Sequence, residues 1–414
     1  MTSIQSSARM VGVAAIAVST SLFLGACTGG SGAAERNESG TSTTWLEDLE
    51  PIELTVSHNP PEKTPSAQAA LAFQRAVTER TDGKVTFENF FASSLLTAGA
   101  DGIDGIGTGT ADMGDIVPFY SPAELPVSTW ASNLGAVRYD TLAESQVVGS
   151  AASFFDYMES EPIAEEFASH NLKVLATNAT TPYELICTKP IDSLDDAKGT
   201  RVRAAGPIWT VGLEALGMIP TTVAFGEVYE ALQRGVIDCT LIPAFGFIDY
   251  NYLDVAKHHI PANFPHTQAM AWAINLDVWN SFPVELQRII QEEAVHMPYD
   301  VSVGHLEKTA EFGEASEKSG IVHHDPAELN KVLDKRYSDV LKDMVSTAPA
   351  QIDDPQSYID TYVARVDDWR TRTKELGNLP EQGQTIQDYY LSLKDPDLDW
   401  YLNELRESVR SKIP

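Results

Sequence analysis

The chain has 414 residues, of which 43% are hydrophobic, and this length is more than a single hydrophobic core usually serves. We therefore expect two lobes. The 29 Lys and Arg side chains stand against 59 Asp and Glu side chains, a formal net charge of -30 at pH 7. Such a surface repels nucleic acids and anionic lipid headgroups, which argues against both as partners. It does not exclude an anionic ligand, because salt screens exposed charges over roughly 8–10 Å and a buried arginine can dominate its own cleft.

The N-terminus has the features of a targeting segment. Val11 to Ala26 is apolar and rich in small residues, but too short for a stable membrane-spanning anchor. It ends on Leu24-Gly25-Ala26-Cys27, which matches a bacterial lipobox, the motif whose cysteine receives lipid after cleavage. The sequence predicts a lipoprotein signal peptide over residues 1-27, lipidation of Cys27 and a flexible tether over residues 28-50. An ordinary signal peptide with an incidental cysteine is the alternative.

Two strands and a helix are expected at the start of the folded chain. Ile52 to Ser57 is typical of a strand, and Lys84 to Phe90 alternates apolar and polar residues as a second strand would. Between them, Thr64-Pro65 opens a helix with a hydroxyl cap and a proline at the first helical position. Asp82-Gly83 closes that helix. Asn59 follows the first strand, where a polar loop begins.

A glycine-rich stretch from Gly99 to Gly114 invites comparison with dinucleotide-binding loops. Its glycines do not lie at a strand-to-helix junction, and no acidic residue closes a βαβ unit about 20 residues later. We therefore interpret the stretch as a helix weakened by glycines, then a turn, then a strand over Ala111 to Val117.

Two segments, Thr108 to Pro118 and Gln233 to Pro243, share one order of features. Each has a helix end, a glycine, an aspartate, a short apolar strand and a proline. Ligands of α/β proteins bind at the carboxyl ends of such strands, so a matching pair suits a two-lobed cleft. The helix before the second strand positions that strand end and is not catalytic. Its expected buried face is Val228, Ala231 and Leu232.

Tyr183 to Thr188 and Gly199 to Arg203 are two further expected strands, with a polar turn between them. Alternation places Arg201 and Arg203 on the same side of their strand. Two arginines are costly to bury unless an anion is paired there, and a guanidinium matches a carboxylate with two hydrogen bonds. The residues alone leave two interpretations open, an anion site and a pair of surface arginines near a sheet edge.

Cys187 and Cys239 could form a disulfide in an oxidising compartment. The sequence favours instead two small buried hydrophobic side chains. No Cys or His spacing suggests a metal, and we expect neither metal nor cofactor. The adjacent pairs His258-His259 and His323-His324 are interpreted as surface or packing residues, because neighbours in sequence do not share a helix face.

Taken together, the segments KPIDSLDDAKGTRVRAAG and EALGMIPTTVAFGEVYEALQRGVID resemble the DctP-type extracytoplasmic solute receptors of TRAP transporters. The resemblance spans roughly Ile52 to Gly377 and is most specific in EVYEALQRGVID. It implies an α/β, two-lobed, periplasmic-binding-protein-like fold of type II, with hinge strands and a long helix across both lobes. We place lobe I at 52-186 plus 268-305, lobe II at 187-267 plus 306-377, and a C-terminal extension at 378-414.

The resemblance also implies a binding site. In this family a signature arginine pairs with a ligand carboxylate through two hydrogen bonds, and the matching position here is Arg203. Local alignment carries a second basic position onto Lys189. It also carries the polar residue that ends the first strand onto Asn59, and an aromatic residue onto Phe225. Arg201 matches a position that is often basic and exposed, so it is left outside the site.

The sequence departs from the family pattern at two places. Ile242 stands where a polar residue usually helps to clamp the carboxylate, and Thr97-Ala98-Gly99 replaces a Gly-Asp/Glu turn. Both changes remove hydrogen-bonding groups, so we expect a monocarboxylate with a hydrophobic or aromatic body rather than a sugar acid or short dicarboxylate. Trp209, Phe245 and Phe247 lie close in sequence to the site strands. The alternative is that Ile242 packs inside its lobe and Asp115 or Thr240 meets the ligand.

The resemblance implies a solute-binding lipoprotein, anchored by lipid at the extracytoplasmic face of the cell membrane. It would capture an organic acid by cleft closure and deliver it to the membrane subunits of a TRAP permease. An ABC-type or sensor-input receptor of the same architecture is the alternative. An enzyme is not expected, because the sequence shows no nucleophile elbow, no HExxH and no paired cleft carboxylates. In the extension, Tyr389, Tyr390, Trp400 and Tyr401 predict helices packed on the body, with a dimer or membrane-partner contact as a further option.

Overall fold

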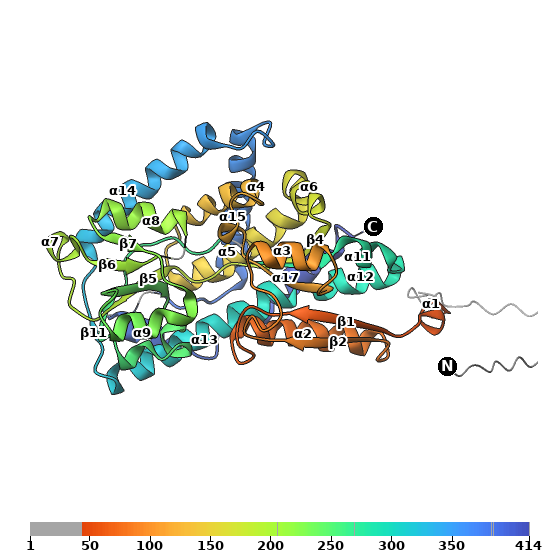
Figure 1. The fold of residues 1–414 in the computed structure, drawn as a ribbon, viewed down its shortest axis with the longest axis horizontal. Helices are drawn as coiled ribbons and strands as arrows, with labels where there is room; N and C mark the ends of the chain where they lie inside the picture. Colours follow the sequence, from red (N-terminus) through yellow and green to blue (C-terminus); the bar gives the residue numbers. More distant parts are fainter. Residues whose placement is uncertain (1–43, 205, 269, 382, 384, 414) are drawn as a thin grey trace, which may run out of the picture. The chain divides into compact units, whose positions relative to one another are not determined.

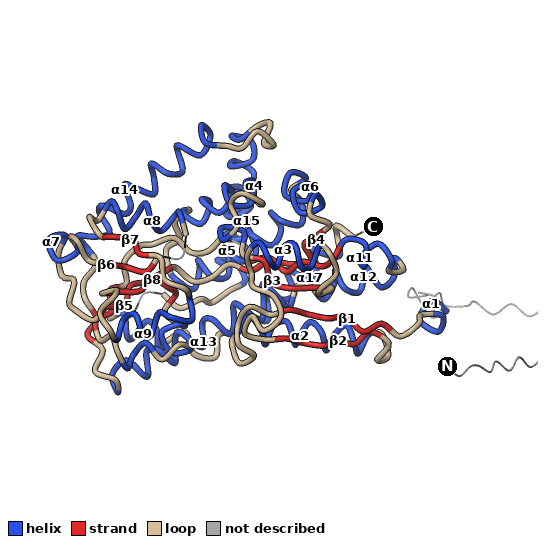
Figure 2. The backbone as a smooth tube through the Cα atoms, viewed as in Figure 1, coloured by secondary structure: helices blue, strands red, loops and turns tan. Residues whose placement is uncertain are grey.

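The structure of this protein is a computed structural model that describes residues 44–204, 206–268, 270–381, 383 and 385–413. The predicted signal peptide, Cys27 and most of the predicted tether lie outside the described residues. The described chain forms two β-sheets with helices packed against both, as Figures 1 and 2 show. This is the two-lobed α/β architecture that the sequence predicts.

The first sheet has five strands in the order β2-β1-β3-β10-β4. The three N-terminal strands are parallel, and β10 runs antiparallel to both of its neighbours. The predicted succession of strand, helix, strand, glycine-containing helix and strand is confirmed. The elements are β1 (Ile52–Ser57), α2 (Pro65–Arg80), β2 (Val85–Phe90), α3 (Ala100–Gly107), β3 (Met113–Ile116), β4 (Leu172–Asn178) and β10 (Met270–Asn275).

The second sheet has six strands in the order β11-β9-β5-β8-β6-β7. Its strands are β5 (Tyr183–Cys187), β6 (Arg201–Arg203), β7 (Ile219–Thr221), β8 (Cys239–Pro243), β9 (His258–Ile260) and β11 (Val322–His323). The expected polar turn between the first two is the short helix α7 (Leu194–Ala197). Before β8, the predicted helix is α9 (Val228–Gln233), and its predicted face is buried. Gly235 has a φ of 66°, a left-handed conformation that suits glycine at a helix end.

The chain crosses between the sheets three times, through two short crossing segments, from β4 to β5 and from β9 to β10, and through the longer helical stretch from β10 to β11. All of β5 belongs to the second sheet, so the expected lobe boundary at residue 186 is wrong and lobe I ends before Tyr183. The reason is register: β5 pairs along its whole length with β8. The end of lobe II also differs from expectation, because α15 (Pro355–Leu376) packs against α5 (Leu142–Glu159) of lobe I.

The predicted long helix across both lobes is α13 (His296–Lys318), which has 23 residues. It packs against α2 and α5 in lobe I and against α10 (Phe245–Asp249) in lobe II. In Figure 1 it runs from below the second sheet toward the first lobe. A single rigid element therefore contacts both walls of the cleft between the lobes.

The other helices cover the two sheets and their connections. The α-helices are α1 (Thr44–Asp48), α4 (Pro126–Ala131), α6 (Glu161–Ser169), α8 (Pro207–Ala215), α11 (Leu276–Ser281), α12 (Val284–Glu293) and α14 (Ala327–Asp343). Short 3₁₀ turns are η1 (Pro118–Tyr120), η2 (Ser132–Ala136), η3 (Phe225–Glu227), η4 (Tyr252–Asp254) and η5 (Met344–Thr347). Across the described residues, no helix combines the length and apolarity that a membrane crossing requires.

The C-terminal extension forms helices α16 (Ile386–Leu391) and α17 (Asp399–Arg410), as predicted. Tyr390 and Tyr401 are fully buried. The Tyr389 hydroxyl accepts a hydrogen bond of 2.9 Å from the Ala143 amide of α5, and the Tyr390 hydroxyl donates at 2.7 Å to the Glu184 carboxylate of β5. The extension is therefore bound to elements of both lobes.

Cys187 and Cys239 form a disulfide, so the preference for two free buried thiols is wrong. The antiparallel register of β5 and β8 places the two residues directly opposite each other, with their Cα atoms 4.1 Å apart. That separation is close enough for a bridge. The sequence does not show that β5 and β8 are neighbours, and it is their pairing that brings the two cysteines together.

Candidate ligand-binding site

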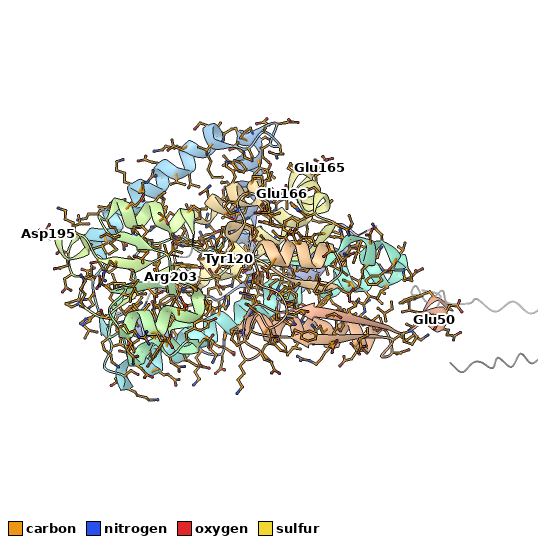
Figure 3. The ribbon with its side chains drawn as sticks, in the orientation of Figure 1. Glu50, Tyr120, Glu165, Glu166, Asp195 and Arg203 are labelled. Atoms are coloured by element: carbon orange, nitrogen blue, oxygen red, sulfur yellow. A yellow bond between two sulfur atoms is a disulfide. The ribbon has the colours of Figure 1, made fainter. Side chains whose placement is uncertain are left out.

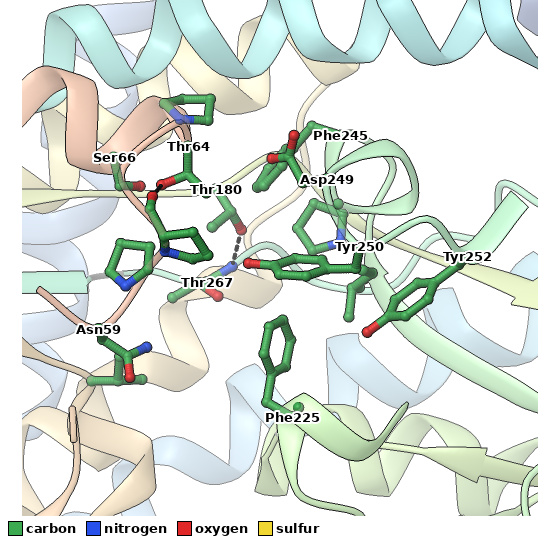
Figure 4. A pocket seen from close by; sticks show the side chains of 18 of the residues that line it. Asn59, Thr64, Ser66, Thr180, Phe225, Phe245, Asp249, Tyr250, Tyr252 and Thr267 are labelled. Atoms are coloured by element: carbon green, nitrogen blue, oxygen red, sulfur yellow. Dashed lines mark hydrogen bonds between the residues drawn. The ribbon is translucent and has the colours of Figure 1, made fainter. Parts of the chain in front are cut away.

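A cavity of about 860 Å³ opens between the two lobes. Its size falls within the roughly 300–1,000 Å³ typical of small-molecule sites. Lobe I contributes Asn59 and the start of α2, and lobe II contributes β6, the end of β8 and α10. Figure 4 shows Asn59, Thr64 and Ser66 on one side of the hollow, with Phe225 and Tyr252 on others. Figure 3 labels Arg203 and Tyr120, which reach the cavity from lobe II and lobe I.

Arg203, the last residue of β6, is the strongest electrostatic feature of the cavity. The residue is only 5% exposed, and within the described part of the chain no carboxylate forms a salt bridge with it. Its Nε is buried and has no hydrogen-bond partner among the described residues. The guanidinium carbon lies 5.2 Å from the centre of the Phe225 ring. A buried cation without a counter-ion is costly, so an anion that enters the cavity is stabilised there.

Arg201, on the same side of β6, is already paired. Its Nε and Nη2 donate to the two carboxylate oxygens of Asp238 at 3.1 and 2.8 Å. The same carboxylate also accepts a hydrogen bond from the Arg201 amide at 2.9 Å. The aspartate before β8 therefore satisfies the outer arginine at the protein surface, and only Arg203 of this pair lines the cavity.

The two crossing segments supply polar groups at the back of the cavity. Thr180 follows β4, and its hydroxyl accepts a hydrogen bond of 3.0 Å from the Thr267 amide, drawn in Figure 4. The Thr267 hydroxyl lies 3.0 Å from the hydroxyl of Tyr183, the first residue of β5. Burial raises the pKa of Tyr183 above its ordinary value, so its hydroxyl stays neutral at pH 7.

An aromatic wall covers the lobe II side of the cavity. Phe225 packs edge-on against Tyr250 with ring centres 4.6 Å apart, and Tyr250 lies 5.8 Å from Tyr252. Phe245 stacks on His305 of α13 at 3.9 Å. Burial lowers the pKa of His305 to about 3, so this ring is neutral at pH 7 and extends the apolar surface.

Four of the five predicted ligand-binding residues line the cavity, namely Arg203, Asn59, Phe225 and Ile242, and Lys189 does not. β5 runs away from the cavity, from Tyr183 to Cys187, and Lys189 lies two residues further on. There its charge acts on Asp196 and Asp238, outside the cavity. The local motif links Lys189 to β5 but does not show which end of that strand faces the cleft.

Ile242 lines the cavity, whereas the alternative contacts Asp115 and Thr240 are not among its lining residues. Asp115 is buried, and its carboxylate accepts a hydrogen bond of 2.6 Å from the amide of Asn59, a lining residue. Of the aromatic residues close in sequence to the site strands, Phe245 reaches the cavity, and Trp209 and Phe247 are buried.

Sequence reasoning missed Thr180, Thr267, Tyr183, Asp249 and the tyrosines at 250 and 252. The available signal was the cluster of aromatic and acidic residues directly after β8, in the segment FGFIDYNYLD. Among the described residues, no group of three or more His, Cys, Asp or Glu side chains is arranged to hold a metal ion.

Two α/β lobes joined by crossing strands, with an arginine-bearing cavity between them, define the class of two-lobed solute-binding proteins of type II. Residues 56–331 match the sequence model of DctP, the bacterial extracellular solute-binding protein family 7, and the chain belongs to this family. It is therefore an extracytoplasmic solute-binding receptor and not an enzyme.

Known proteins resemble the chain at a distance. The C4-dicarboxylate-binding periplasmic protein DctP of Rhodobacter capsulatus is 25% identical over 244 residues, 58% of this chain and 69% of that protein. A TRAP periplasmic solute-binding protein of Bordetella bronchiseptica, solved with bound mandelate, is 20% identical with a TM-score of 0.67 and covers 77% of this chain and 99% of its own. The ectoine-binding protein of the TeaABC TRAP transporter of Halomonas elongata is 18% identical with a TM-score of 0.65. The match covers 77% of this chain and 100% of that protein.

Proposed function

We propose that this protein captures a small organic acid with one carboxylate, and that Arg203 binds this carboxylate. The observation that carries the proposal is the buried guanidinium of Arg203, which lines the cavity without a salt-bridge partner among the described residues. A carboxylate can accept two parallel hydrogen bonds from a guanidinium, and such charge-assisted bonds are about twice as strong as neutral ones. Relatives whose ligands are carboxylates, such as the R. capsulatus protein, agree with this assignment.

The rest of the cavity favours an apolar or aromatic ligand body. Phe225, Phe245 and Ile242 line it, and the two tyrosines of the wall add ring surface. Each Å² of apolar ligand surface that they cover contributes about 25 cal/mol, whereas a buried unpaired hydroxyl or second carboxylate costs roughly 1–3 kcal/mol. The neighbour solved with mandelate, an aromatic monocarboxylate, has the same fold.

We infer that ligand capture closes the cleft about the two crossing segments and that the loaded protein delivers its solute to a TRAP permease. Solved neighbours of this fold are TRAP periplasmic solute-binding proteins, which supports this partner. The lipobox at Cys27 supports a lipid anchor at the extracytoplasmic face of the cell membrane. Changing Cys27→Ala should release the protein from the membrane fraction or leave an unprocessed precursor. Mature Cys27→Ala protein that stays membrane-bound would contradict the anchor.

A thermal-shift screen of organic acids tests the binding function. A ligand at 100 times its Kd adds about 2.7 kcal/mol to the free energy of unfolding. We expect at least one monocarboxylate with an apolar body to raise Tm, and the amide of the same compound to have no effect. A screen in which the amides stabilise as strongly as the acids would contradict the role of Arg203.

A further inference from the structure

A second ionisable side chain, Asp249, lines the same cavity at the end of α10. Its side chain is 12% exposed, and Lys308 of α13 approaches it only to 4.0 Å. That lysine is itself bound to Glu311 at 2.6 Å. In residues 44–413, apart from the four undescribed positions, nothing donates a hydrogen bond to the Asp249 carboxylate, and the nearest salt bridge is this long one. Asp249 is therefore a largely buried carboxylate that lacks a close partner.

The charges of the lining residues indicate which kind of ligand charge suits the cavity. Among the described lining residues, Arg203 is the one Lys or Arg, whereas Asp249, Glu230 and Asp254 all carry carboxylates. Glu230 and Asp254 are exposed at the rim, where water and salt weaken their effect. Water and salt screen the charge of Asp249 much less, because its side chain is largely buried. A ligand that is only an anion would gain the attraction of Arg203 and meet the repulsion of Asp249 in one enclosed space.

The surroundings of Asp249 suit a cation. Figure 4 shows Asp249 beside Phe245 and above Tyr250, on the edge of the hollow that Phe225 and Tyr252 also border. The faces of aromatic rings attract cationic nitrogen, most strongly where water is excluded. His305 also lines the cavity, but its imidazole is neutral at pH 7 and supplies no positive charge. A cationic group would thus find a carboxylate and several ring faces together.

We propose that the solute is a zwitterion whose carboxylate binds Arg203 and whose cationic nitrogen binds Asp249 among the aromatic rings. This inference rests on the proposed function, and it narrows the monocarboxylate to an amino acid, an imino acid or a betaine. It also accounts for how a cavity with more acidic than basic lining residues accepts a carboxylate. Burial raises the pKa of Asp249 to about 6, which leaves the carboxylate ionised at pH 7.5 and ready to pair with the nitrogen.

Calorimetry with pairs of ligands that differ only by the nitrogen tests this inference. Suitable pairs are cyclohexanecarboxylate with piperidine-2-carboxylate, cyclopentanecarboxylate with proline, and 3-phenylpropanoate with phenylalanine. At pH 7.5 we expect the nitrogen-bearing member of at least one pair to bind the unmodified protein at least 10-fold more tightly than its partner. In Asp249→Asn this ratio should fall to within about 2-fold, while the plain acid binds at least as well as before. Glu227→Gln removes an exposed carboxylate outside the cavity lining and should leave the ratio unchanged.

The outcomes separate the two proposals. If plain acids bind as tightly as their nitrogen-bearing partners and depend on Arg203, the zwitterion inference is wrong and the proposed function stands. A preference for nitrogen that persists in Asp249→Asn would also overturn the inference. If no acid and no zwitterion binds, both proposals are wrong. Circular dichroism and Tm of Asp249→Asn show whether that variant is folded, and Asp249→Glu, which keeps the charge, should retain more of the preference than Asp249→Asn.

Discussion

The guanidinium of Arg203 lies against the ring of Phe225, with 5.2 Å between the guanidinium carbon and the ring centre. Phe225 precedes α9 and is 38% exposed, so one face of the arginine is covered by a ring that also borders the cleft. Such a contact restrains the guanidinium without occupying its N–H groups. The donors of Arg203 therefore stay available for a ligand, whereas those of Arg201 are bound to Asp238.

Ile242 should control how polar a ligand the cavity accepts. Ile242→Asn places an amide where the family usually has a polar clamp, so we expect weaker binding of apolar acids and tighter binding of hydroxylated ones. The change in relative affinity should be about 1–3 kcal/mol, the cost of leaving one polar group unpaired. Calorimetry of both variants with an aromatic acid and a hexuronic acid measures it. Ile242→Leu keeps an apolar wall and serves as the control. Tight binding of succinate or a hexuronic acid by the unmodified protein would show that the wall does not select against polar ligands.

Asp115 should make the stability of the protein fall as pH rises. Burial raises its pKa to about 7, and the hydrogen bond from the Asn59 amide opposes this only in part. Because the pKa is higher in the folded state than in the unfolded state, folding is favoured at low pH and this contribution is lost as pH rises through 7. Asp115→Asn keeps an acceptor for Asn59 but cannot ionise.

The measurement for Asp115 is the difference in free energy of unfolding between the unmodified protein and Asp115→Asn, followed from pH 5 to pH 8.5. Relative to Asp115→Asn, the unmodified protein should lose on the order of 2–4 kcal/mol over this range. Asp112→Asn, which changes a neighbouring carboxylate, is the matched control for charge. If the difference in free energy of unfolding does not vary with pH, Asp115 does not titrate with a raised pKa in the folded protein.

The Cys187–Cys239 disulfide should stabilise lobe II. The bridge joins residues 52 apart in sequence, and a loop of that length corresponds to about 4 kcal/mol of chain entropy removed from the unfolded state. We expect Cys187→Ala with Cys239→Ala to lower the free energy of unfolding by roughly 2–4 kcal/mol in urea titrations. Dithiothreitol should reproduce most of this loss in the unmodified protein and none of it in the double variant. Equal stability of the oxidised and reduced protein would contradict a structural disulfide.

Sequence motifs place a side chain at the cavity only where a strand end fixes its position. Arg203 and Ile242 lie at or near the ends of β6 and β8, and Asn59 follows β1, so local pattern alone places them at the cleft. Lys189 lies outside the cavity lining, and motif alignment does not show which end of β5 meets the cavity.

The rest of the site depends on contacts between distant segments. Asp249 and Tyr250 belong to or follow α10, and the packing of α10 on α13 decides which of its residues face the cleft. Thr180 and Thr267 come together only because the β4–β5 segment and the β9–β10 segment meet at one place. The disulfide likewise requires the β5–β8 register, which no local pattern shows.

The most direct test of the binding site compares Arg203→Lys with Arg201→Lys by calorimetry, using the best ligand from the organic-acid screen. Lysine keeps the charge but loses the planar pair of donors, so Arg203→Lys should weaken binding by about 2–4 kcal/mol, or roughly 30- to 1,000-fold. Arg201→Lys should change the affinity by less than about 3-fold, because Arg201 binds Asp238 outside the cavity. Equal losses in both variants, or unchanged affinity in Arg203→Lys, would contradict the account.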